Sequence, residues 1–164
     1  MEKKPPILTY KGCDFHVWFH GKEFYDAALV LREAGNVNAP YYICLSFSIE
    51  LFIKCLHTTT EFKSAREVKL SVHPRSKKHS LTELIGHLPE EMKSDCERKY
   101  FRKYTRSLSE DINHISNVFM NYRYQYEDIN TNTRRELCLT VLDDVGAFFF
   151  EYSTNAGNFS QVLK

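Results

Sequence analysis

Apolar residues dominate one stretch of the chain, residues 41–56, which reads YYICLSFSIELFIKCL and contains only two charged residues, Glu50 and Lys54. A run of this length without Gly or Pro is about twice as long as a usual strand, so the pattern favours a helix. A helix that is apolar nearly all round is typical of the centre of a soluble helical core. Glu50 and Lys54 stand four residues apart and should meet on one face. The sequence therefore predicts a buried central helix here.

Helical spacing of apolar residues recurs on both sides of this stretch. Residues 22–34 predict a helix that ends at Gly35, and the short turn that follows makes it the antiparallel partner of the central helix. Three later helices begin with capping boxes, in which a Ser or Thr and a Glu three residues later satisfy each other's backbone N–H groups. The boxes are Ser80–Glu83, Ser107–Glu110 and Thr133–Glu136. With another helix after Pro89, the prediction is an all-α protein: a single bundle of five or six helices over residues 21–152.

The two ends of the chain lack this periodicity. Residues 1–20 are expected to be an irregular segment that anchors onto the core through Phe15, Val17, Trp18 and Phe19. Residues 153–164 are polar and are expected to form a loose C-terminal tail.

Composition gives few functional clues. Lys and Arg number 22 against 21 Asp and Glu, so any nucleic-acid signal must be local. Five scattered cysteines without a Cys-x-x-Cys pair, and a start without the apolar stretch of a signal peptide, favour a reduced cytoplasmic protein. Cys13, His16 and His20 have the spacing of half a zinc site but lack a fourth ligand, so no metal or other cofactor is predicted. The central stretch is too short and too polar to span a bilayer, so no membrane partner is expected.

Two local stretches are strongly basic. Residues 61–79 contain six Lys or Arg and only two Glu; a solvated loop is the commoner structure for such a run, with phosphate binding as the alternative. Residues 98–106 interleave bases with Tyr100, Phe101 and Tyr104. Such an alternation can hold single-stranded RNA by phosphate contact and stacking. An amphipathic helix whose charged ends reach solvent explains the same residues and is the preferred interpretation.

Three pieces of the chain, SIELFIKCL (48–56), KKHSLTELIGHLPEE (77–91) and FMNYRYQYE (119–127), resemble the HEPN superfamily of prokaryotic helical domains. The first is similar to the family's central helix with Glu and Lys one turn apart. The second is similar to its His-x-Leu helix start after a variable basic loop. The third is similar to a Phe-x3-Arg-Tyr-x-Tyr-Glu signature of some members. The likeness spans roughly residues 22–152 and implies a homodimer in a toxin–antitoxin or phage-defence system, with RNA or a nucleotide, a cognate antitoxin or a defence protein as partner.

Many HEPN members are metal-independent ribonucleases whose Arg-x4–6-His motif lies late in the bundle. Its His would transfer protons and its Arg would stabilise the charged phosphorane. Here Arg66 and His73 have the spacing but lie in the basic loop, His114 precedes Arg123 by nine residues, and Arg106 precedes His114 by eight. The resemblance therefore favours a dimeric binding or regulatory module without the standard catalysis. A metal-independent endoribonuclease using candidates among Arg66, His73, His114 and Arg123 is the alternative, and a structural protein-interaction module is the second alternative, so the sequence leaves open whether the protein is an enzyme.

The candidate binding residues are the charges of the central helix, the histidine that starts the later helix and the polar cluster of the third piece. They are Glu50, Lys54, His79, Arg123, Tyr124, Tyr126 and Glu127. Arg123 and Glu127 are expected to form a structural salt bridge, with bidentate phosphate or nucleotide binding as the alternative. Because an unpaired buried charge is costly, Glu50 and Lys54 need partners. The hypothesis that follows is one pocket that joins Glu50, Lys54, Arg123 and Glu127.

Overall fold

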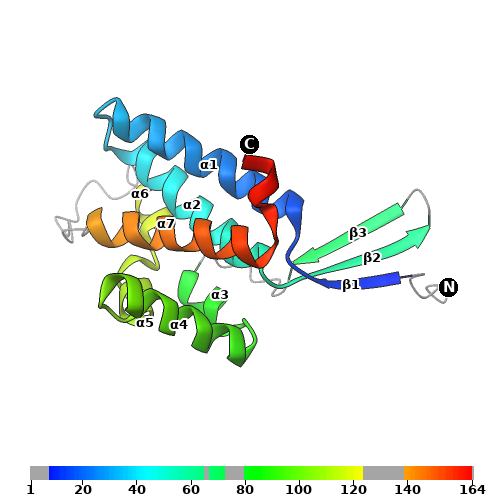
Figure 1. Ribbon diagram of the computed structural model, residues 1–164. Helices are drawn as coiled ribbons and strands as arrows, with labels where there is room; N and C mark the ends of the chain where they lie inside the picture. Colours follow the sequence, from blue (N-terminus) through cyan, green and yellow to red (C-terminus); the bar gives the residue numbers. More distant parts are fainter. Residues whose placement is uncertain (1–7, 65–66, 73–79, 124–138, 164) are drawn as a thin grey trace.

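The computed structural model describes residues 8–64, 67–72, 80–123 and 139–163 (Figure 1). The elements in these ranges are, in chain order, β1 (Leu8–Gly12), α1 (Phe15–Glu33), α2 (Ala39–Cys55), β2 (Thr58–Ser64), β3 (Glu67–Val72), α3 (Leu81–Gly86), α4 (Glu90–Tyr104), α5 (Leu108–Ile115), α6 (Val118–Arg123), α7 (Leu139–Ala156) and the 3-10 helix η1 (Phe159–Leu163). No helix within these ranges has both the length and the apolar character that a membrane span requires.

The predicted central helix and helical bundle are confirmed. α2 lies in the middle of the bundle and packs against α1, α6 and α7 (Figure 1). Ile49 and Phe52 of α2 are completely buried. A Cβ added at Gly21 of α1 would lie 2.9 Å from the Phe52 ring, so only glycine allows α1 and α2 to approach this closely. The apolar sequence of α2 therefore produces the core around which the other helices are arranged.

Side-chain caps fix where the helices start. Asp14 accepts a hydrogen bond from the backbone N–H of Val17 at the start of α1. Ser107 accepts one from Glu110 at the start of α5, and Ser80 one from Glu83 at the start of α3. The serine half of two of the predicted capping boxes is thus confirmed. The third, Thr133–Glu136, lies outside the described residues.

A three-stranded antiparallel sheet, in the order β1–β2–β3, extends from one end of the bundle and was not predicted (Figure 1). Its register pairs Gly12 with Thr58 in β1–β2, and Thr58 with Val72 in β2–β3. The irregular chain expected over residues 8–12 is therefore wrong, and so is the solvated loop expected within residues 61–79, where the structure has strand at 61–64 and 67–72. The sequence of β3, EVKLSV, alternates apolar and polar residues as a half-buried strand does. The high density of basic residues over 61–79 nevertheless favoured a loop in the sequence analysis.

Both ends of the bundle also differ from expectation. α1 begins at Phe15, so the segment 1–20 is not irregular throughout. Within it Trp18 is completely buried and anchors on the core as expected, whereas Phe15 and Phe19 are 36% and 40% exposed. The expected loose tail is helical to Ala156 and again over Phe159–Leu163. The ring of Phe159 lies 5.0 Å from that of Trp18, which holds the C-terminal turn on α1.

Candidate functional site on helix α4

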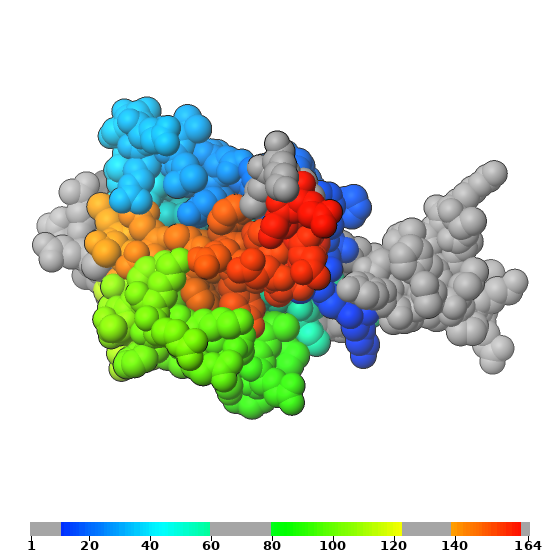
Figure 2. Space-filling model, in the orientation of Figure 1, coloured from blue at the N-terminus to red at the C-terminus, as the bar shows by residue number. Residues whose placement is uncertain are grey.

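Helix α4 combines a narrow buried face with a broad exposed one. Cys96 and Tyr100 are its buried side chains, and it packs against α5 on one side and α7 on the other. Four basic side chains lie on the exposed part of the helix, at positions that helical geometry brings to one face. They are Arg98, Lys99, Arg102 and Lys103, called here the cationic face. In Figure 2 the green and lime surface of residues 80–120 meets the orange surface of α7 on one side of the molecule.

A groove of about 580 Å³ separates the cationic face from α7. Its lining residues come from these two helices and are Lys99, Arg102, Lys103, Phe148, Glu151, Tyr152, Asn155 and Ala156. Because the basic residues line one wall, this α4–α7 groove presents ammonium and guanidinium groups beside an aromatic surface. Such a combination suits a polyanion that also carries flat rings.

The bases of the cationic face differ in their partners. The Nζ atom of Lys99 lies 2.8 Å from Asp95 Oδ2, and Arg98 pairs with the same carboxylate. Lys103 pairs with Glu151 of α7. Arg102 has no ion pair or hydrogen bond within the ranges that the structure describes. Exposed ion pairs of this kind contribute only about 0–1 kcal/mol, so a bound phosphate can replace their carboxylates at little cost.

The pairs also set the protonation states of the groove. Hydrogen bonding from Lys99 lowers the pKa of Asp95, and hydrogen bonding to Glu151 raises the pKa of Lys103. Burial raises the pKa of Tyr152, which stays a neutral phenol and donates a hydrogen bond over 3.0 Å to Asp95 Oδ2. Both shifts favour the charged forms of Asp95 and Lys103, so they strengthen the ion pairs along the groove.

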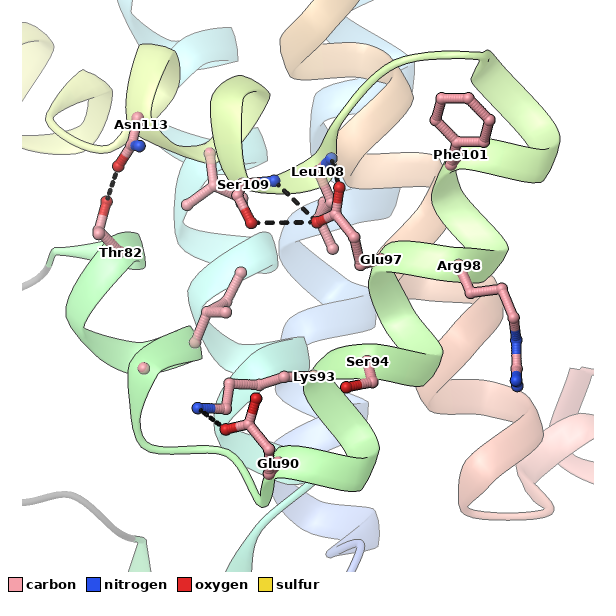
Figure 3. A pocket seen from close by; sticks show the side chains of 13 residues that line it. Thr82, Glu90, Lys93, Ser94, Glu97, Arg98, Phe101, Leu108, Ser109 and Asn113 are labelled. Atoms are coloured by element: carbon pink, nitrogen blue, oxygen red, sulfur yellow. Dashed lines mark hydrogen bonds and ion pairs between the residues drawn. The ribbon is translucent and has the colours of Figure 1, made fainter.

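A second groove, of about 750 Å³, lies on the other side of α4, between α3 and α5 (Figure 3). Its apolar lining consists of Ile85, Leu108 and Ile112, with Phe101 at its edge. Phe101 is 58% exposed, more than the exposed rings of Phe15, Phe19 and Phe24. Arg98 lines this groove and also belongs to the cationic face, so the two surfaces are continuous along α4. We call this depression the α3–α4–α5 groove.

The charged side chains Glu97, Glu90 and Lys93 of the α3–α4–α5 groove all have partners in its lining. Glu97 accepts hydrogen bonds from the backbone N–H groups of Leu108 at 3.0 Å and Ser109 at 3.1 Å, which caps α5. Lys93 Nζ lies 2.6 Å from Glu90 Oε2. These contacts are drawn as dashed lines in Figure 3. The groove therefore carries little uncompensated charge, in contrast to the cationic face beside it.

Arg106, just after α4, is held by carboxylates on two other helices. Its Nε donates to Asp111 Oδ2 and its Nη2 to Asp144 Oδ2, each over 2.8 Å. Tyr100 donates its hydroxyl to Asp111 Oδ2 over 2.6 Å. Hydrogen bonding to Asp144 is the main cause of the raised pKa of Arg106. This network joins α4, α5 and α7, so it supports the fold and leaves Arg106 little capacity for a phosphate.

The structure describes four of the candidate residues that the sequence predicted. Glu50 and Lys54 form the expected ion pair, with Glu50 only 1% exposed. His114 lies exposed on α5, and Arg123 is the last residue of α6. The remaining candidates, Arg66, His73, His79, Tyr124, Tyr126 and Glu127, lie outside the described residues. The pocket joining Glu50, Lys54, Arg123 and Glu127 therefore stays a prediction.

Among the described residues, no set of metal ligands is completed around Cys13, His16 and His20, which have the spacing of half a zinc site. His16 and His20 both lie on the exposed side of α1, and His20 Nδ1 contacts Glu23 Oε2 at 2.9 Å. No group of three or more His, Cys, Asp or Glu side chains among the described residues is placed to hold a metal ion.

Comparisons of this chain with models of protein families, with curated proteins and with solved structures find no match. The residues of α4 were singled out by sequence as a basic and aromatic alternation. The two grooves that flank the helix were not, because they depend on where α3, α5 and α7 pack.

Proposed function

We propose that this protein is a helical binding module that holds single-stranded RNA on the cationic face of α4. The observation that carries the proposal is the gathering of Arg98, Lys99, Arg102 and Lys103 on one exposed helical face, next to the exposed ring of Phe101. Positive side chains neutralise successive phosphates of a strand, and an exposed aromatic ring stacks on an unpaired base.

The spacing of the bases supports a strand that runs along the helix. Arg98 and Arg102, like Lys99 and Lys103, are four residues apart, which is about 6 Å along a helix that rises about 1.5 Å per residue. Two rows of cations therefore follow the helix axis. The row with Lys99 and Lys103 lines the α4–α7 groove, and Arg98 borders the α3–α4–α5 groove.

Three further parts of the proposal come from the HEPN resemblance. They are RNA as the ligand, a homodimer, and a place in a cytoplasmic toxin–antitoxin or defence system. The all-α bundle around an apolar α2 with its Glu50–Lys54 pair supports that resemblance. Exposed apolar side chains on α1, among them Phe19, Leu29 and Val30, support self-association or a protein partner. Sedimentation equilibrium of the purified chain tests the homodimer, since a monomer across micromolar concentrations would exclude it.

Salt-dependent binding of a fluorescent single-stranded RNA tests this function. Wild type should bind with an affinity that falls steeply as salt rises. Arg102→Ala should bind more weakly and reduce the slope of log K against log salt by about 0.7, the value for one phosphate contact on a single strand. Lys22→Ala is the matched control, because Lys22 is a helical lysine of α1, outside the cationic face. Equal slopes for all three proteins would remove α4 from the binding surface, and the absence of any binding would end the proposal.

Metal-independent RNA cleavage is the alternative function, and exposed His114 is the observation that favours it. An exposed imidazole can transfer protons, whereas Arg106 is committed to Asp111 and Asp144. The test is incubation of labelled RNA with the protein in excess EDTA. Cleavage that is lost in His114→Ala but kept in His16→Ala would establish a ribonuclease, and intact RNA with the folded, RNA-binding protein would favour the binding module.

A further inference from the structure

We infer that the α3–α4–α5 groove is a pocket for an unpaired nucleobase of the strand whose phosphates lie on the cationic face. This inference rests on the proposed function and adds a second contact region to it. It assigns phosphates to the cationic face and one base to the groove. The pocket would take a base only from a single strand, because a base inside a duplex is stacked and paired.

Position is the first reason. The groove and the cationic face share Arg98, and Phe101 stands at the edge between them. In Figure 3 both side chains come from α4: Arg98 extends outward, away from Lys93 and Glu97, and the Phe101 ring stands near the end of the helix. A strand held by Arg98 and Arg102 therefore passes the mouth of the groove, with its bases within reach of the Phe101 ring. No additional rearrangement of the helices is needed to bring the two surfaces together.

Charge is the second reason. The groove's carboxylates and ammonium group are already compensated: Glu97 by the N–H groups of Leu108 and Ser109, and Lys93 by Glu90. A phosphate entering the groove would meet two carboxylates, so it is better held outside by the cationic face. A neutral, flat base meets no such repulsion, and its polar edge replaces water with protein hydrogen bonds.

The lining is the third reason. Ile85, Leu108 and Ile112 supply apolar contact for the base faces, and the exposed ring of Phe101 supplies a stacking surface. Polar groups for the base edges stand nearby: the hydroxyl of Ser94 has no hydrogen bond within the described ranges, and Asn113 uses its Oδ1 to accept from Thr82 over 3.1 Å. A volume of about 750 Å³ lies within the roughly 300–1,000 Å³ of small-ligand sites.

The experiment uses a short single-stranded RNA with 2-aminopurine at its centre and a second RNA that is abasic at the same position. Wild type should bind the abasic strand at least about 5-fold more weakly, in line with the loss of one stacked base. The fluorescence of 2-aminopurine should change on binding to wild type. Phe101→Leu should bind both strands with the weaker affinity and lose the fluorescence change.

The control is Phe19→Leu, because Phe19 is a similarly exposed aromatic residue on α1, outside the groove. It should behave as wild type. Asn113→Ala, at the opposite wall of the groove, should also reduce the preference for the intact strand. Equal binding of intact and abasic strands by wild type, with binding still weakened in Arg102→Ala, would overturn the base pocket and leave RNA binding standing. No binding of either strand by wild type would overturn the proposed function as well.

Discussion

The ammonium group of Lys99 lies 5.0 Å from the centre of the Tyr152 ring, and its Nζ atom lies 2.8 Å from Asp95 Oδ2. Tyr152 in turn donates its hydroxyl to the same carboxylate oxygen over 3.0 Å. The three side chains therefore form a closed set that fixes one wall of the α4–α7 groove against α7. Because Lys99 covers the Tyr152 ring on α7, the exposed ring of Phe101 on α4 is the better surface for stacking a base.

This set predicts a defined pH dependence. Hydrogen bonding from Lys99 holds the pKa of Asp95 below its ordinary value of 3.8. The stability that Asp95 contributes should thus be complete above pH 3.8 and disappear as the pH falls through the lower pKa of the folded state. The difference in unfolding free energy between wild type and Asp95→Asn should therefore shrink below pH 4, which urea unfolding at several pH values measures. A difference that stays constant down to pH 2 would contradict the shifted pKa.

Loss of the Arg106 network should destabilise the bundle. Arg106→Ala leaves Asp111 and Asp144 without the cation that both contact, and these carboxylates are only 12% and 24% exposed. We expect a loss of about 2 kcal/mol in unfolding free energy, reduced from the value of a fully buried pair because Arg106 is partly exposed. Arg102 lies four residues earlier, on α4, and has no partner among the described residues. Arg102→Ala should therefore change the free energy of unfolding by less than about 0.5 kcal/mol. Equal unfolding curves for the two variants would show that the network contributes nothing.

Trp18 should be the largest single contributor to the attachment of α1 and the C-terminal turn. It is completely buried, donates its indole N–H to Thr154 Oγ1 over 3.2 Å and contacts the rings of Phe150 and Phe159. Trp18→Ala should cost about 3–5 kcal/mol. Phe19→Ala, one residue along on the exposed side of α1, should cost less than about 1 kcal/mol. Chemical unfolding of both variants decides this, and a small effect at Trp18 would contradict the observed packing.

The pocket predicted to join Glu50, Lys54, Arg123 and Glu127 is testable by a double-mutant cycle. Glu50 is buried and paired with Lys54, which is the one contact of the predicted pocket that the described residues include. If Arg123 contributes to it, Glu50→Gln and Arg123→Gln should couple by about 1 kcal/mol or more in unfolding free energy. The control cycle combines Glu50→Gln with Lys22→Gln on α1 and should show no coupling. Purely additive effects in the first cycle would exclude a shared pocket.

Much of the fold could be predicted from the sequence because its signals are local. The apolar run 41–56 required a buried helix, and Ser80 and Ser107 marked two helix starts that the structure confirms. The sheet was missed because its strands pair residues far apart, such as Gly12 with Thr58, and because the basic run over 61–79 favoured a loop. The C-terminal turn was missed because it is held by an aromatic contact between distant residues, Phe159 with Trp18, in an otherwise polar sequence.

In the candidate site too, local features could be predicted from the sequence and contacts between distant residues could not. The bases and aromatics of α4 are adjacent in sequence, and their shared face follows from helical periodicity. The grooves depend on contacts between distant residues, such as Thr82 with Asn113 and Glu97 with Leu108. The ion pair between Arg106 and Asp144 could not be predicted either, because the two residues are far apart in the sequence.

The most direct test of the central claim is photo-crosslinking of a 4-thiouridine-containing single-stranded RNA to the intact protein, followed by mass-spectrometric identification of the attached residues. The proposal predicts crosslinks concentrated in α4, with Phe101 foremost, and their loss in Arg102→Glu but not in Lys22→Glu. Crosslinks distributed over α1 or the sheet and unaffected by Arg102→Glu, or no crosslinks at all, would contradict it.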